Sequence, residues 1–159
     1  MSISLLTLGL MGTLAFLASL VSGQFGLLGV KQHFVLSLVA TLLLVMAHSF
    51  VMFFLIATGV EMKDIEKEAG LGDSFRRRTI ALKSRVFPVA TLALLLVIAN
   101  FILGGAAHTR AMPMWAHSLI AWGTFAVCAL ALWRESLALG ENNRLIEEIG
   151  ARRRGAARG

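Results

Sequence analysis

Long uncharged segments alternate with short charged ones along this chain. Lys31 is the only charged side chain in residues 2–60, and Arg110 is the only one in residues 86–133. Because roughly 20 uncharged residues cross the hydrocarbon layer as a helix, this pattern predicts an integral membrane protein. The expected fold class is all-α, a four-helix bundle formed by a single membrane domain over residues 1–159. Its membrane-spanning helices are predicted at residues 4–22, 33–60, 86–106 and 114–138.

Basic residues are concentrated in two segments, the connection 61–85 and the C-terminal tail 139–159, with Arg134 just before the tail. The other two connections carry one basic residue each, Lys31 and Arg110. Because cytoplasmic connections of membrane proteins are enriched in Lys and Arg, both termini and the 61–85 connection are predicted to be cytoplasmic. The expected location is the bacterial inner membrane. The formal net charge of +6 then predicts contacts with anionic lipids at the cytoplasmic face. Because the basic tail directly follows the last membrane span, we assign it to the membrane surface and expect no nucleic-acid partner.

The two charged segments contain further helical signals. The sequence "EMKDIEKEAG" is expected to extend the second helix as far as Gly70, and a short basic helix is expected to follow Asp73 or Ser74. The sequence "ENNRLIEEI" after Gly140 predicts a short amphipathic helix. Both segments are too small for an enzymatic domain, so we expect them to serve for docking.

Polar side chains inside the second and fourth predicted helices fall on one face of each helix. At 100° per residue, those of the second helix lie within a sector of about 100°. They are His33, Ser37, Thr41, His48 and Thr58. The corresponding stripe of the fourth helix contains His117, Thr124, Cys128 and Glu135. Such side chains commonly hydrogen-bond across membrane helices, so both stripes are predicted to face protein.

The histidines are the candidate binding residues, because an ionisable group inside a membrane is often functional. His33, His108 and His117 are expected to gather at one membrane face. His48 lies about 22 Å deeper along its helix, which puts it near the expected bilayer centre. Its expected neighbours are polar residues of similar depth, such as Asn100, Thr91, Thr124 or Cys128.

One possible ligand is a b-type haem, whose bis-imidazole coordination takes histidines from two helices at similar depth. His33 together with His117, or with His108, satisfies this requirement for one haem. A second haem beside His48 would need a matching histidine near residues 124–132, and none is present there. His48 is therefore a candidate for an interior polar or redox-linked group.

Copper is a second possible ligand. The sequence "HTRAMPMWAH" offers two imidazoles and two thioethers, which together suit Cu(I), from His108, Met112, Met114 and His117. Zinc catalysis is disfavoured because no carboxylate accompanies these histidines. A di-iron site is excluded by the expected lack of carboxylates inside the membrane. The sequence contains no nucleotide-binding glycine loop and no serine-hydrolase motif.

These observations predict a small integral membrane subunit of a larger membrane complex, related to electron transfer, in which the outer histidines bind haem or a metal. With no catalytic motif of its own, the chain is expected to be an accessory subunit that contacts other membrane proteins. The alternative is a cofactor-free structural or assembly subunit, whose polar stripes pack helices, lipid or a quinone.

Overall fold

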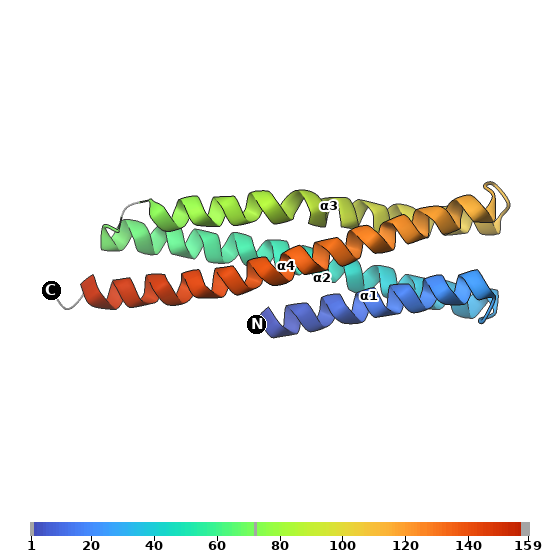
Figure 1. Cartoon of the computed structure of the whole chain (residues 1–159), viewed down its shortest axis with the longest axis horizontal. Helices are drawn as coiled ribbons and strands as arrows, with labels where there is room; N and C mark the ends of the chain where they lie inside the picture. Colours follow the sequence, from blue (N-terminus) through green and yellow to red (C-terminus); the bar gives the residue numbers. More distant parts are fainter. Residues whose placement is uncertain (1, 72, 157–159) are drawn as a thin grey trace.

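The chain forms a bundle of four long helices, seen in a computed structural model that describes residues 2–71 and 73–156 (Figure 1). Each helix is long and apolar enough to cross a membrane. The prediction of an all-α membrane protein built as a four-helix bundle is thereby confirmed at this level. The helices are α1 (Ser2–Phe25), α2 (Val30–Ala69), α3 (Ser74–His108) and α4 (Met114–Ala156).

The predicted extension of the second helix as far as Gly70 is confirmed, because α2 ends at Ala69 and Gly70 is its C-cap, whereas α3 and α4 are longer than the predicted membrane spans. The connection 61–85 is mostly helical, and the expected short basic helix after Asp73 or Ser74 is the first part of α3, which continues without a break from Ser74 to His108. The expected separate helix after Gly140 is wrong, since α4 runs through this glycine without a break. The tail 139–159 is thus helical as far as Ala156, and its last three residues lie outside the described part. Apolar residues continue to pack together beyond the uncharged segments, which is why the helices continue too.

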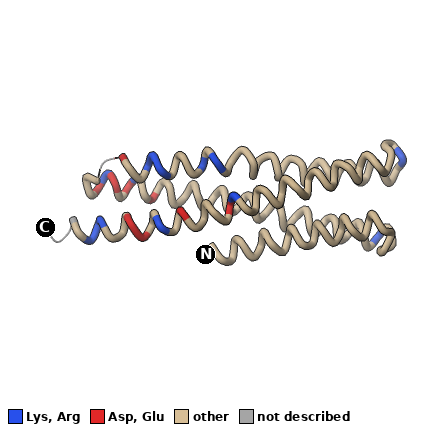
Figure 2. The backbone as a smooth tube through the Cα atoms, viewed as in Figure 1, with Lys and Arg blue, Asp and Glu red and all other residues tan. Residues whose placement is uncertain are grey.

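The bundle has two different ends. We call the end where α2 is followed by α3 the charged end, because most acidic and most basic residues lie in that half (Figure 2). The opposite end is called the histidine end, because His33, His108 and His117 lie there. The N-terminus of α1 lies part-way along the bundle, so only α2, α3 and α4 continue into the charged end as a three-helix stalk (Figure 1).

Helix α1 marks the extent of the uncharged half. Its 24 residues span about 36 Å, close to the hydrocarbon thickness plus part of the headgroup layer. Among the described residues, α1 packs against α2 and α4, and α2 also meets α4 across the bundle, whereas α1 and α3 do not meet. Small residues permit this close packing, since a Cβ at Gly12 would lie 3.1 Å from the Leu44 backbone nitrogen.

Candidate functional site

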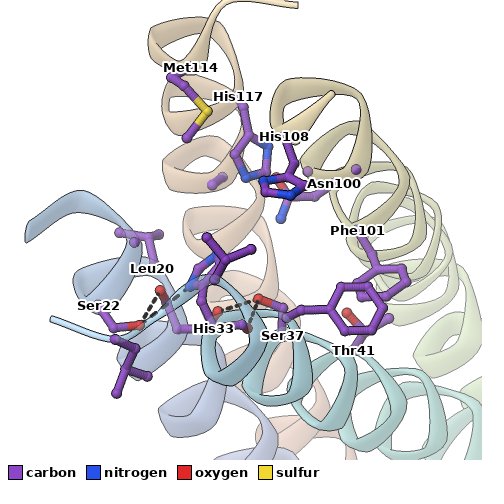
Figure 3. A pocket seen from close by; sticks show the side chains of 18 of the residues that line it. Leu20, Ser22, His33, Ser37, Thr41, Asn100, Phe101, His108, Met114 and His117 are labelled. Carbon is purple, nitrogen blue, oxygen red and sulfur yellow. Dashed lines mark hydrogen bonds between the residues drawn. The ribbon is translucent and has the colours of Figure 1, made fainter. Parts of the chain in front are cut away.

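A cavity of about 670 Å³ lies inside the histidine end, among all four helices (Figure 3). Three histidines from three helices line it: His33 of α2, His108 of α3 and His117 of α4. The structure therefore brings together the histidines that the sequence expects at one membrane face. Apolar side chains supply much of the remaining wall, among them Phe16, Leu20, Phe34, Phe101 and Ala121.

His33 lies in the first turn of α2 and its imidazole packs against α1. A Cβ at Gly23 would lie only 2.8 Å from the His33 Cε1 atom, so the glycine makes room for the ring. The Ser22 hydroxyl donates to the Ser19 carbonyl at 2.9 Å, and its oxygen lies 3.5 Å from His33 Nδ1. Because the serine hydrogen is used, this long contact fits the tautomer of His33 that carries its hydrogen on Nδ1 and its lone pair on Nε2.

His117 has a matching position on the other pair of helices. It lies in the first turn of α4, and its ring packs against α3 at Gly104, where a Cβ would lie 3.3 Å from the His117 Cε1 atom. Its Nδ1 atom is buried and has no hydrogen-bond partner among the described residues. Thus α2 and α4 supply one imidazole each, and α1 and α3 supply the glycines that seat them.

The deeper wall of the cavity carries a few polar groups. Ser37 donates to the His33 carbonyl at 2.8 Å and lies 2.7 Å from the hydroxyl of Ser19. Thr41 also lines this part of the cavity. The side-chain oxygen of Asn100 is buried there with no hydrogen-bond partner among the described residues. A mainly apolar chamber with a few fixed polar groups is typical of sites for small organic ligands, and its volume lies in their usual range.

The proposed copper ligands are only partly assembled. His108, Met114 and His117 line the same cavity, whereas Met112 does not line it. The Met114 side chain is largely exposed, which suits a position at the mouth of the cavity. Within the described residues, no group of three or more His, Cys, Asp or Glu side chains is arranged to hold a metal ion.

His48 lies apart from this cavity and has a partner that the sequence analysis missed. Its Nδ1 atom forms a 2.8 Å hydrogen bond with the carboxylate of Glu135 on α4, and both side chains are 1% exposed. The expected neighbours did not include Glu135, and the expectation that no carboxylate lies between the membrane helices is wrong for this residue. The signal was available, because Glu135 falls on the same polar stripe as His117.

The reason is geometric. The helical rise gives the depth of a residue along its own helix, but it does not give the shift of one helix along another. In the bundle, α4 crosses α2 so that the two residues meet within the half that α1 covers, since Gly9 of α1 lies beside Ala47 and Leu132. The Nε2 atom of His48 is buried with no hydrogen-bond partner among the described residues.

No family model, no curated protein and no solved structure matches this chain.

Proposed function

We propose that this chain is a small integral membrane electron-transfer protein whose cavity binds one b-type haem through His33 and His117. The observation that carries the proposal is the pair of imidazoles, one from α2 and one from α4, that line the same apolar cavity at the same end of the bundle. Bis-imidazole coordination by two helices of a bundle requires this arrangement.

The residues around the two imidazoles fit the proposal. The contact of His33 Nδ1 with the Ser22 hydroxyl favours the tautomer with a free Nε2, and hydrogen bonds of this kind orient metal-binding histidines. The glycines Gly23 and Gly104 fix where each ring lies. Aromatic and aliphatic walls suit the faces and edges of a porphyrin.

The bound haem would supply reversible one-electron chemistry. The protein's own residues would hold it, orient it and tune its potential through the axial imidazoles and the dielectric of the cavity. Since the electron must come from one molecule and pass to another, the proposal includes membrane partners that donate and accept it. We therefore assign the chain to a larger membrane assembly as an electron-transfer subunit.

The test is optical and paramagnetic spectroscopy of the chain, produced with a haem precursor and purified in mild detergent. We expect one low-spin haem per chain, and its loss in both His33→Ala and His117→Ala. His108→Ala is the matched control and is expected to retain the haem. Gly23→Ala is expected to lose haem because its Cβ would displace the His33 ring. The matched control is Gly123→Ala, at an exposed position of α4 outside the cavity lining, whose Cβ would meet nothing within 4 Å, and it is expected to retain the haem.

Other results would overturn the proposal. Stoichiometric copper that depends on His108 and His117 would assign the site to the metal instead, through the imidazole and thioether groups at the cavity mouth. A chain with neither chromophore nor metal, even after reconstitution with haem, would favour the cofactor-free reading, in which the cavity seats a lipid or a quinone.

A further inference from the structure

A second hollow, of about 370 Å³, lies between α3 and α4 where the uncharged half of the bundle meets the stalk. Two arginines line it, Arg85 from α3 and Arg134 from α4, and they mark the first charges met on these helices from the histidine end apart from Arg110 (Figure 2). We call it the Arg85–Arg134 groove. Its other lining residues are Leu82, Ser84, Val86, Pro88, Leu137, Ala138 and Glu141.

The two guanidinium groups are fixed only loosely. Arg134 donates one long hydrogen bond, 3.4 Å, to the carbonyl of Arg85. Arg85 lies 3.7 Å from Glu141, and both side chains of this pair are substantially exposed. Exposed pairs of this length contribute little free energy. The two arginines against one carboxylate leave the groove with an excess of positive charge and with unused N–H donors.

The backbone of the groove adds a further polar group. Pro88 lies inside α3 and has no N–H, so the carbonyl of Ser84, four residues earlier, lacks its helical donor. The two arginines are therefore next to a local irregularity of the helix, where side chains from α4 reach the α3 backbone. The groove therefore contains a backbone carbonyl without a helical donor, next to two arginine side chains.

The side of the groove toward the histidine end is apolar. Pro88 is exposed there. On α4, the exposed Leu137 lines the groove, and Trp133, one helical turn away on the same face, is 61% exposed. Tryptophan is favoured at the boundary between hydrocarbon and headgroups. The N-terminus of α1 lies near the same level of the bundle (Figure 1). The groove thus combines cationic donors with an adjoining apolar surface at the level expected for a membrane interface.

We propose that the Arg85–Arg134 groove binds the headgroup phosphate of an anionic phospholipid, with the acyl chains lying along Pro88 and Trp133. Arginine suits phosphate because its planar group presents several donors at once. A free phosphate would leave the apolar side without a partner, which is why a lipid is the occupant. The bound lipid would hold α3 against α4 beside Glu135. This proposal does not depend on haem binding.

The experiment is native mass spectrometry of the full-length protein in detergent, titrated with phosphatidylglycerol, phosphatidylcholine or inorganic phosphate. We expect phosphatidylglycerol to bind most tightly, and its affinity to fall by roughly tenfold or more in Arg85→Gln/Arg134→Gln. The matched control is Arg77→Gln/Arg144→Gln, which removes the same charge from exposed positions of the stalk. It is expected to leave the affinity nearly unchanged.

Circular dichroism of each variant checks that the helices remain intact, and Arg85→Lys/Arg134→Lys, which keeps both charges, is expected to retain part of the affinity. Should the double glutamine variant fail to fold, the single Arg85→Gln substitution is expected to weaken binding by several-fold. Equal losses in the groove and control variants would overturn the proposal in favour of diffuse surface charge. Binding of inorganic phosphate that depends on both arginines, without preference for the lipid, would also overturn it, as would equal affinity for phosphatidylcholine.

Discussion

His48 and Glu135 each need the other as a hydrogen-bond partner, because both side chains are buried. Each is buried in the apolar interior, where an unpaired carboxylate is strongly unfavourable. Their 2.8 Å hydrogen bond joins α2 to α4 across the bundle. Pairs of this kind often add little net stability, but losing one partner leaves the other group buried and unpaired. The pair therefore fixes which residues of the two helices meet.

This argument predicts the outcome of a double-mutant cycle. His48→Leu is expected to destabilise the protein by about 3–5 kcal/mol, because it leaves the Glu135 carboxylate without a partner. The double substitution His48→Leu/Glu135→Leu is expected to be more stable than His48→Leu alone. Reversible unfolding in mixed detergent micelles, followed by helical circular dichroism, measures these free energies. Strict additivity of the two single substitutions would show that the pair makes no coupled contribution.

The sequence predicts which polar residues lie between the helices, but it does not predict which side chains meet. It identifies the histidines and the polar stripes, because these follow from residue type and from helical periodicity. It does not identify the partner of His48, because that requires the relative shift of α2 and α4 along their axes. The grouping of His33, His108 and His117 could be expected only because all three lie next to connections, where depth is fixed by the turn itself.

At the scale of the helices, the turn between α2 and α3 is held by one buried carboxylate. Glu66 of α2 is 4% exposed and accepts hydrogen bonds from the backbone N–H groups of Phe75 at 2.6 Å and Arg76 at 3.0 Å. These groups belong to the first turn of α3 and have no partner within their own helix. Asp73, at the position before the helix, makes no capping hydrogen bond with its side chain. Glu66 thus caps α3 from the preceding helix.

We expect Glu66→Ala to destabilise the protein by about 2 kcal/mol, because two backbone N–H donors, one of them buried, lose their charged acceptor. Glu66→Gln, which retains one acceptor oxygen, is expected to lose less. The control is Glu68→Ala, since Glu68 is exposed and lies 3.7 Å from Arg153, and a change below about 0.5 kcal/mol is expected there. Chemical unfolding of the three variants measures the difference. Similar losses for Glu66→Ala and Glu68→Ala would contradict the capping role.

The sequence predicts the existence and type of all four helices and the end of α2 at Gly70. It starts the third membrane span too late and ends the fourth too early. Hydropathy marks where a helix leaves the uncharged half, and it carries no information on where the helix ends. Gly70 is a real end, because it adopts a left-handed conformation with φ of 62° and its N–H bonds back to Glu66. Gly140 is not an end, although the sequence looks similar, since the buried residues Leu139 and Leu145 continue the core on either side.

For the whole molecule, the two ends of the bundle differ in charge. In the stalk, Glu148 accepts hydrogen bonds from Arg78 and Arg152, and the hydrogen bond from Arg78 lowers the pKa of this carboxyl. The stalk therefore carries ionised groups of both signs over the ordinary pH range. The histidine end instead has an apolar cavity and few charges. The bundle is therefore asymmetric along its axis, and the orientation predicted from its basic residues would place the charged end in the cytoplasm and the histidine end outside.

Labelling of single cysteines tests that orientation, because the native Cys128 is fully buried and is expected to be silent toward a membrane-impermeant maleimide. On intact cells we expect Ala111→Cys, at an exposed position of the histidine end, to be labelled. Glu68→Cys, at an exposed position of the charged end, is expected to be labelled only after the membrane is permeabilised. The unsubstituted protein is the control for Cys128. The reverse pattern would place the stalk outside, and it would move the proposed haem to the cytoplasmic side, where its electron donors and acceptors would be different molecules.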